Sequence, residues 1–170
     1  MIRAVLFDRD GTLIADDPAS ETVKAMRGAV AAVEFVRECG LKVGVVTNQP
    51  QLAGDLGAAQ RMQRTHALIE QQFGQFDGWF VCAHAAAAHC ACRKPQPGLI
   101  MQAAQAFGVG PHEIAVIGDI GSDVEAARAA GAFAVMVPTS VTLAKEIACA
   151  PVVCNDAFEA VVAALGRQPR

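Results

Sequence analysis

Two carboxylates at the end of an apolar run are the first residues in the chain that are suited to chemistry. The run starts at Ile2 and ends in Asp8-Arg9-Asp10-Gly11-Thr12. Its lack of polar alternation is typical of a strand buried on both faces of a parallel sheet, and ligands bind just beyond the carboxyl ends of such strands. Asp8 and Asp10 repel each other unless a cation holds them, which predicts a Mg²⁺ site. The alternative is a strand followed by a polar turn, because Asp-Gly is common in turns.

Further polar groups follow other apolar runs and are expected at the same edge of the sheet. They are Thr47 and Asn48, Arg93 and Lys94, and Asp119 and Asp123. With the first two carboxylates, this set supplies what phosphoryl transfer through an aspartyl intermediate needs. One carboxylate attacks phosphorus, and a second donates a proton to the leaving oxygen and later takes one from water. A lysine and a metal ion balance the charge on the equatorial oxygens, and a hydroxyl orients them.

Asp123 has two interpretations. Ser122 and Glu125 are spaced as a capping box, so Asp123 falls in the first turn of a predicted helix, where the helix dipole favours any carboxylate. The other interpretation places Asp123 at the water shell of the Mg²⁺ ion. The sequence leaves both interpretations open.

A cluster of cysteines and histidines directly precedes Arg93. Cys82-Ala83-His84 and Cys90-Ala91-Cys92 place three thiols and an imidazole within residues 82–92. This set suits a tetrahedral Zn²⁺ site, which is closed and therefore structural. We prefer His84 to His89 as the fourth ligand, because each Cys-x-His or Cys-x-Cys pair lets two ligands bind one ion. The alternative is a loop with incidental thiols.

The remaining cysteines and histidines are expected to be structural. Cys39, Cys149 and Cys154 stand apart from the cluster and are predicted to be small core residues. His66 and His112 are predicted to lie on helix surfaces.

Apolar runs alternate with helical periodicity along the chain, which predicts an α/β fold with a doubly wound parallel sheet. Strands are expected near residues 2–7, 43–46, 79–82, 114–117 and 134–137, and helices near 26–39, 62–73, 99–107, from 122 onward, and up to 165. The segments between the motifs have room for these elements and the 82–92 loop only. We therefore expect one domain, 1–170, without a cap domain.

Composition narrows the class of protein. The 170 residues are 53% hydrophobic and 18% charged, which is typical of a globular chain. A net charge of −3 gives no reason to expect nucleic acid or an anionic membrane as a partner. No leader peptide or membrane-spanning stretch is recognisable, so we expect a cytoplasmic protein. We also expect a monomer.

The four motifs occur in an order that resembles the haloacid dehalogenase (HAD) superfamily, within its phosphatase branch. The resemblance extends from residue 2 to about 137. It implies a Rossmann-like core and a Mg²⁺-dependent phosphomonoesterase, with Asp8 as nucleophile and Asp10 as general acid and base. It also implies that Asp119 completes the Mg²⁺ site with Asp8 and the Asp10 carbonyl.

The same resemblance assigns residues that bind substrate. Thr47 and Lys94 are expected to hold the phosphate, and Asn48 and Arg93 belong to the same group of phosphate- and substrate-binding residues.

The cysteine loop is similar to that of one branch of the family, which holds D-glycero-D-manno-heptose-1,7-bisphosphate 7-phosphatases and histidinol-phosphate phosphatases. We therefore expect a small phosphorylated metabolite as substrate, in the first place a sugar phosphate such as a heptose bisphosphate. Histidinol phosphate is the rival, because the five residues between His84 and Cys90 match the short form of the loop. The branch commonly has Arg-Gly where this chain has Gly54 and Asp55, so a cationic contact with the substrate is missing.

Two alternatives come from other functional classes. A phospho-accepting receiver domain is also doubly wound, but its aspartate follows a strand in the middle of the chain and it has no zinc loop. A non-catalytic zinc-binding module would have no need of the complete set of acidic and basic residues described above.

Overall fold

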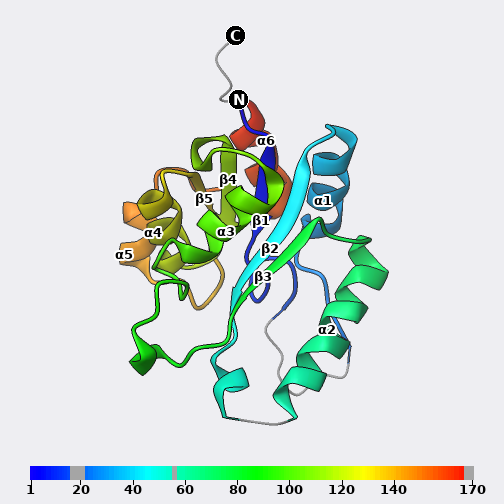
Figure 1. Ribbon diagram of the computed structural model, residues 1–170. Helices are drawn as coiled ribbons and strands as arrows, with labels where there is room; N and C mark the ends of the chain where they lie inside the picture. Colours follow the sequence, from blue (N-terminus) through cyan, green and yellow to red (C-terminus); the bar gives the residue numbers. More distant parts are fainter. Residues whose placement is uncertain (16–21, 55–56, 167–170) are drawn as a thin grey trace.

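The computed structural model describes residues 1–15, 22–54 and 57–166 (Figure 1). Its strands form one sheet in the order β3-β2-β1-β4-β5, and every neighbouring pair is parallel. The strands are β1 (Ala4–Phe7), β2 (Lys42–Asn48), β3 (Gly78–Cys82), β4 (Ile114–Gly118) and β5 (Phe133–Met136). The chain moves outward from β1 to β3 and then crosses to β4 on the other side. This reversal puts the switch point of the sheet at the carboxyl end of β1, where α/β proteins bind ligands.

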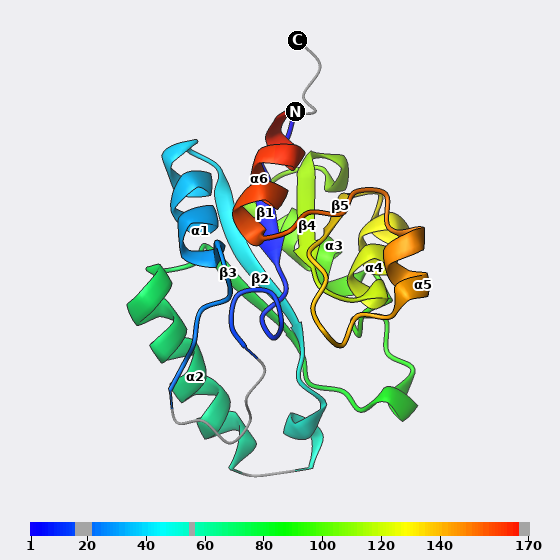
Figure 2. The same ribbon diagram turned by 180° about the vertical axis from the view of Figure 1, so that it is seen from behind.

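Helices cover both faces of the sheet. The helices are α1 (Ala29–Glu38), α2 (Ala58–Phe73), α3 (Gly98–Phe107), α4 (Gly121–Ala130), α5 (Ala144–Cys149) and α6 (Ala157–Gly166), with 3₁₀ turns η1 (Pro50–Ala53), η2 (Ala86–Ala88) and η3 (Pro111–Glu113). Helix α6 lies behind the sheet in Figure 1 and in front of it in Figure 2, whereas α3 lies on the opposite face. The fold therefore has three layers.

The alternation of side chains along β1 explains why this strand reads as a continuous apolar run. Val5 and Phe7 pack in the core beside α1 and α6, while Ala4 and Leu6 pack in the core beside α3 and α4. All four residues are fully buried. Burial of a side chain the size of Leu or Phe stabilises the fold by about 1.5–3 kcal/mol. The central strand thus anchors the residues that follow it.

The predicted α/β class and doubly wound parallel sheet are confirmed, and each predicted strand is present within two residues at its ends. The segments that link β1 to β2 and β2 to β3 hold, in their described parts, α1 in the first case and η1 with α2 in the second. No cap domain is present in those parts. In the described ranges, every helix is too short or too polar to cross a membrane.

Two local predictions were wrong. Helix α4 begins at Gly121, one residue before Ser122, and no side chain caps it from the N-cap position. Cys39 and Cys149 are exposed, because they end α1 and α5 on the solvent side, and only Cys154 of the three separate cysteines is buried.

Candidate active site

A cavity of about 490 Å³ opens at the carboxyl edge of the sheet. It brings together six of the residues that the sequence singles out. They are Asp8, Asp10, Thr47, Asn48, Lys94 and Asp119. The strands β1, β2 and β4 deliver most of them directly, because parallel neighbours end at the same edge.

Lys94 lies at the centre of the acidic part of the cavity. Its Nζ donates to Asp8 Oδ1 at 2.6 Å, to Asp123 Oδ1 at 2.5 Å and to the Val46 carbonyl at 3.1 Å. Only 3% of the lysine side chain is exposed. Burial alone lowers the pKa of Lys94, but the Asp123 and Asp8 carboxylates outweigh it and hold the pKa above its ordinary value. The ammonium therefore stays charged.

Three carboxylates converge around this single ammonium. Oxygen atoms of Asp8, Asp119 and Asp123 lie within 4.8 Å of one another. Burial raises the pKa of Asp8 to about 7, Asp123 and Asp119 add to the rise, and Lys94 opposes it. Burial and then Asp123 raise the pKa of Asp119 to about 6. The site thus carries more negative charge than its own cation neutralises.

The donor set fits a Mg²⁺ ion, which prefers oxygen ligands. Asp119 Oδ1 is buried and has no hydrogen-bond partner among the described residues. The rest of Asp119 is held in place, because Thr142 Oγ1 donates to its carbonyl at 2.7 Å and Thr139 Oγ1 to its Oδ2 at 3.4 Å. An oriented, buried carboxylate oxygen without a partner is costly unless a cation or water binds it.

Asp123 serves the start of α4 and the acidic cluster at the same time. Its Oδ2 accepts from the Ile120 backbone N–H at 3.2 Å, while its Oδ1 faces Lys94. Asp123 is 1% exposed. Asp123 therefore satisfies the helix end, which is one of its two predicted roles, and it also fixes the Lys94 ammonium.

Asp10 is held by two neighbours that the sequence analysis did not identify. Arg9 Nε donates to Asp10 Oδ1 at 2.9 Å, and Arg9 NH2 donates to Asp10 Oδ2 at 2.8 Å. Gln49 Nε2 donates to Asp10 Oδ2 at 2.9 Å and to Thr47 Oγ1 at 2.8 Å. Gln49 thus connects the predicted acid–base residue to the predicted phosphate-binding hydroxyl. The only sequence signal for either residue was its position inside a motif.

Asn48 and Arg93 both form hydrogen bonds with backbone groups of the loop that ends at Lys94. Asn48 Oδ1 accepts from the Lys94 N–H at 3.0 Å, and its Nδ2 donates to the Lys94 carbonyl at 3.1 Å. Both polar ends of this amide therefore position the Lys94 backbone beside β2. Arg93 NH1 donates to the His84 carbonyl at 3.5 Å, and its side chain does not line the cavity.

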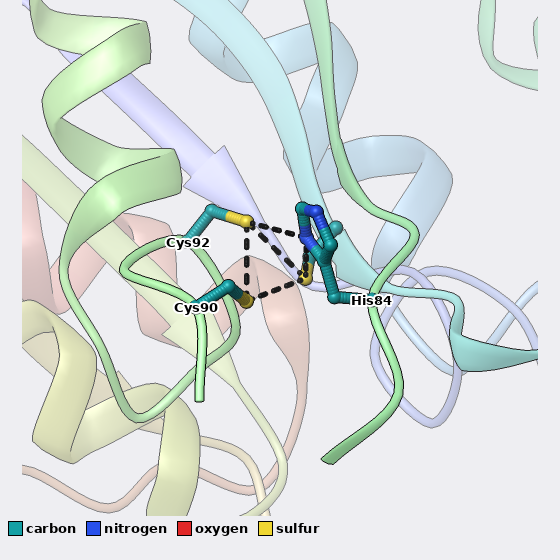
Figure 3. A group of neighbouring side chains, drawn as sticks. His84, Cys90 and Cys92 are labelled. Atoms are coloured by element: carbon teal, nitrogen blue, oxygen red, sulfur yellow. Dashed lines mark hydrogen bonds between the residues drawn. The ribbon is translucent and has the colours of Figure 1, made fainter. Parts of the chain in front are cut away.

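The cysteine and histidine cluster is assembled as the sequence predicts (Figure 3). Cys92 Sγ lies 3.3 Å from Cys82 Sγ, 3.5 Å from Cys90 Sγ and 3.2 Å from His84 Nδ1. Cys82 Sγ lies 3.6 Å from both Cys90 Sγ and His84 Nδ1. A tetrahedral zinc site with Zn–S bonds of about 2.3 Å has S···S edges of about 3.8 Å, so these residues fit the ion.

His89 lies outside this cluster, and it adopts a left-handed conformation with φ 47° at the end of η2. The cluster contacts the backbone next to Lys94, because the Arg93 N–H donates to Cys90 Sγ at 3.4 Å. Lys94 is the next residue. The loop that gathers the thiols therefore also places the lysine.

The prediction that His66 lies on a helix surface was wrong. Its ring is partly buried and stacks on Trp79, with ring centroids 3.7 Å apart and an angle of 17° between the planes. Burial and the nearby Arg9 guanidinium lower the pKa of His66 to about 4. His112 is exposed, as predicted.

Gly54 ends η1 and is exposed, and no atom lies within 4 Å of the position that a Cβ would take there. Asp55 lies outside the described residues.

Comparisons with known proteins show which family this chain resembles. The model of the family described as HAD-hydrolase-like matches residues 91–161. A D-glycero-β-D-manno-heptose-1,7-bisphosphate 7-phosphatase from Neisseria meningitidis serogroup A is 31% identical over 140 residues, which cover 76% of this chain and 74% of the relative. The enzyme of the same name from Pseudomonas putida is 31% identical over 146 residues, covering 81% of this chain and 83% of the relative.

A solved structure resembles the whole fold. The crystal structure of D,D-heptose 1,7-bisphosphate phosphatase from B. bronchiseptica, complexed with magnesium and phosphate, aligns with a TM-score of 0.80 at 27% identity. The alignment covers 98% of this chain and 100% of the relative.

Proposed function

Since this chain belongs to the haloacid dehalogenase-like hydrolases and is a phosphatase, we propose that it hydrolyses a sugar phosphate, in the first place a heptose 1,7-bisphosphate. The observation that carries the mechanism is the convergence of Asp8, Asp10, Thr47 and Lys94 on one cavity beside the acidic cluster. The names of the relatives support the choice of a heptose bisphosphate. They also argue against a receiver domain and against a non-catalytic zinc module.

In the first step, a carboxylate oxygen of Asp8 attacks phosphorus, and the bond from phosphorus to the sugar oxygen breaks. Asp10 gives its proton to the departing oxygen, which leaves as an alcohol. Lys94 stabilises the charge on the transferred phosphoryl group, and the Thr47 hydroxyl orients its oxygens. The fixed positions of these groups lower the barrier, because little reorganisation is needed during the reaction.

In the second step, water attacks the phosphorus of the aspartyl phosphate on Asp8. Asp10, now a carboxylate, takes a proton from that water, and the bond between phosphorus and Asp8 breaks. Inorganic phosphate is released, and both carboxyl groups return to their initial states.

Asp8, Asp119 and the Asp10 carbonyl are the groups that would hold Mg²⁺, with Asp123 close enough to contact its water shell. When bound, the ion supplies positive charge next to the phosphoryl oxygens and offsets the surplus of carboxylates. Asp119 contributes the buried oxygen that lacks a partner among the described residues.

Cys82, His84, Cys90 and Cys92 would hold Zn²⁺ as a closed structural site. Their role in the reaction is indirect, because the loop that they define leads into Arg93 and Lys94. A phosphate-binding ammonium needs an accurate position, and this loop together with Asn48 sets it.

The substrate is tested with purified enzyme and Mg²⁺ against a panel of phosphate esters, measuring released inorganic phosphate. The panel contains D-glycero-β-D-manno-heptose 1,7-bisphosphate, histidinol phosphate, other sugar phosphates and p-nitrophenyl phosphate. We expect the highest kcat/KM for the heptose bisphosphate, with release at position 7. A higher value for histidinol phosphate would move the assignment to the rival substrate, and absence of hydrolysis throughout the panel would contradict the proposal.

A further inference from the structure

Arg9 forms a fork around the side chain of the residue that follows it. Its Nε and NH2 atoms each donate to a different oxygen of Asp10, at 2.9 and 2.8 Å. Only 10% of the Arg9 side chain is exposed, compared with 27% for Asp10. A planar guanidinium that binds both oxygens of a carboxylate sets the plane of that carboxylate as well as its position.

Gln49 restrains the same carboxylate from the side of β2. Its Nε2 donates to Asp10 Oδ2, which therefore accepts two of the hydrogen bonds described here, whereas Oδ1 accepts one. A carboxylate oxygen has two lone pairs. Oδ1 is thus the oxygen with a position left to carry the proton that Asp10 gives to the leaving oxygen, and Asp10 lines the cavity.

Arg9 is itself held by a second layer of side chains. Its NH1 lies 3.5 Å from His66 Nε2 on α2. Arginine has only donors, so Nε2 must accept and the proton of the neutral ring must be on Nδ1. The lowered pKa of His66 keeps the ring neutral at pH 7.

Trp79 on β3 completes this second layer. Its ring stacks on His66, and its Nε1 donates to Glu70 Oε1 at 2.8 Å. His66 on α2 therefore supports Arg9 directly, and Trp79 on β3 supports His66.

We propose that Arg9, supported by His66, is a positioning residue that fixes the Asp10 carboxylate for proton transfer to the leaving oxygen. This inference rests on the role of Asp10 given under the proposed function. Arg9 does not line the cavity, so it acts through Asp10 and not on the substrate.

The physical basis is the sensitivity of proton transfer to geometry. A catalytic group displaced by about 1 Å can lose ~10²-fold in rate. Without Arg9, the Asp10 side chain keeps, of the hydrogen bonds that the described residues give it, the one from Gln49, and it gains rotational freedom. The loss should depend on the leaving group, because a poor leaving group such as a sugar alkoxide needs the proton and p-nitrophenolate hardly does.

The test compares kcat for p-nitrophenyl phosphate with kcat for the sugar phosphate that the panel shows to be turned over fastest. For Arg9→Ala we expect a loss of at least about 10-fold on the sugar phosphate and less than about 3-fold on p-nitrophenyl phosphate. Arg9→Lys should recover little, because an ammonium cannot bind both oxygens in one plane. Arg27→Ala is the matched control, because its side chain is 83% exposed, pairs with Asp156 and does not line the cavity.

A double-mutant cycle separates positioning from general damage. In the Asp10→Asn background, Arg9→Ala should cause no further loss that depends on the leaving group. His66→Phe keeps a ring to stack on Trp79 but removes the acceptor for Arg9, and it should show a smaller loss in the same direction. This variant also serves as the test if Arg9→Ala does not fold, as judged by circular dichroism and Tm.

Equal losses on both substrates for Arg9→Ala and His66→Phe, or no loss in either variant, would overturn the inference alone. If Asp10→Asn itself loses activity equally on both substrates, Asp10 is not the general acid. The positioning role of Arg9 is then also wrong, because it depends on that role of Asp10. A leaving-group dependence in Asp10→Asn but not in the Arg9 and His66 variants would leave the proposed function intact.

Discussion

Lys94 Nζ lies 2.6 Å from Asp8 Oδ1, although 86 positions separate the two residues in the chain. The contact depends on Asn48, whose amide holds the Lys94 backbone against the end of β2. It joins the expected nucleophile to the expected phosphate-binding cation before any substrate is present. Substitution of either partner of this ion pair should therefore change both activity and stability.

Asp8→Asn should lower kcat by on the order of 10⁴-fold or more, because an amide cannot attack phosphorus to form the intermediate. The variant should also be more stable than the wild type in metal-free buffer near pH 7. Burial raises the pKa of Asp8 to about 7, so its charged form costs the folded state stability as pH rises from about 4 toward 7. Phosphate release and chemical denaturation measure the two effects. Normal turnover would remove Asp8 from the mechanism.

Lys94→Met should destabilise the metal-free protein by about 3–5 kcal/mol, since it leaves the Asp8 and Asp123 carboxylates buried without their cation. Added Mg²⁺ should restore part of this stability, and activity should remain low because the phosphate loses its ammonium. Urea titrations with and without Mg²⁺ provide the measurement, and Lys145→Met on the exposed side of α5 is the control. An unchanged midpoint would show that the ion pair contributes little to folding.

Asp10→Asn should affect substrates according to their leaving groups. General acid catalysis contributes on the order of 10²–10⁴-fold, and mostly when a poor leaving group departs. We therefore expect a much larger drop in kcat for a sugar phosphate than for p-nitrophenyl phosphate. Steady-state rates on both substrates decide the question, and equal drops would argue against an acid role.

The purified protein should carry about one Zn²⁺ per chain, held by the Cys₃His cluster. Cys92→Ala should lose the ion, lower the Tm and reduce activity, because metal binding contributes to folding and the loop positions Lys94. Cys149→Ala is the matched control, because that thiol is exposed and outside the cluster. Elemental analysis and Tm are the readouts. Absence of zinc together with full activity in Cys92→Ala would contradict both the site and its link to Lys94.

Protonation of His66 should make the free energy of unfolding depend on pH between about 4 and 6.5. Its pKa is lowered from 6.5 to about 4, mainly by burial, so the unfolded state binds more protons between these values. The contribution of the neutral ring to stability is fully present above pH 6.5 and is lost as pH falls toward 4. We expect this loss to be on the order of 1 kcal/mol, because solvent screens the partly exposed ring. Urea unfolding of wild type and His66→Gln from pH 7 to 4 should give converging stabilities, and parallel curves would contradict the assignment.

The amino-acid sequence by itself determined the α/β class, the strands, the residues at their ends and the cysteine cluster. The central strand could be predicted because a strand that is buried on both faces of a parallel sheet consists almost entirely of apolar residues. The cluster could be predicted because all of its members lie within residues 82–92, and this short spacing keeps their side chains close enough to bind one ion. Acidic residues at strand ends could be grouped because parallel strands end at a common edge.

Tertiary structure alone decided how these groups are paired. Asn48 turns its amide to the Lys94 backbone, and Asp123 divides its oxygens between a helix start and the lysine. His66 is partly buried because Trp79 and Arg9 lie beside it. The physical reason is that the direction of a side chain depends on packing between elements far apart in the chain, which residue types and spacing do not encode locally. The hydrogen bond from Gln49 to Asp10 became visible only when the carboxyl ends of β1 and β2 came together.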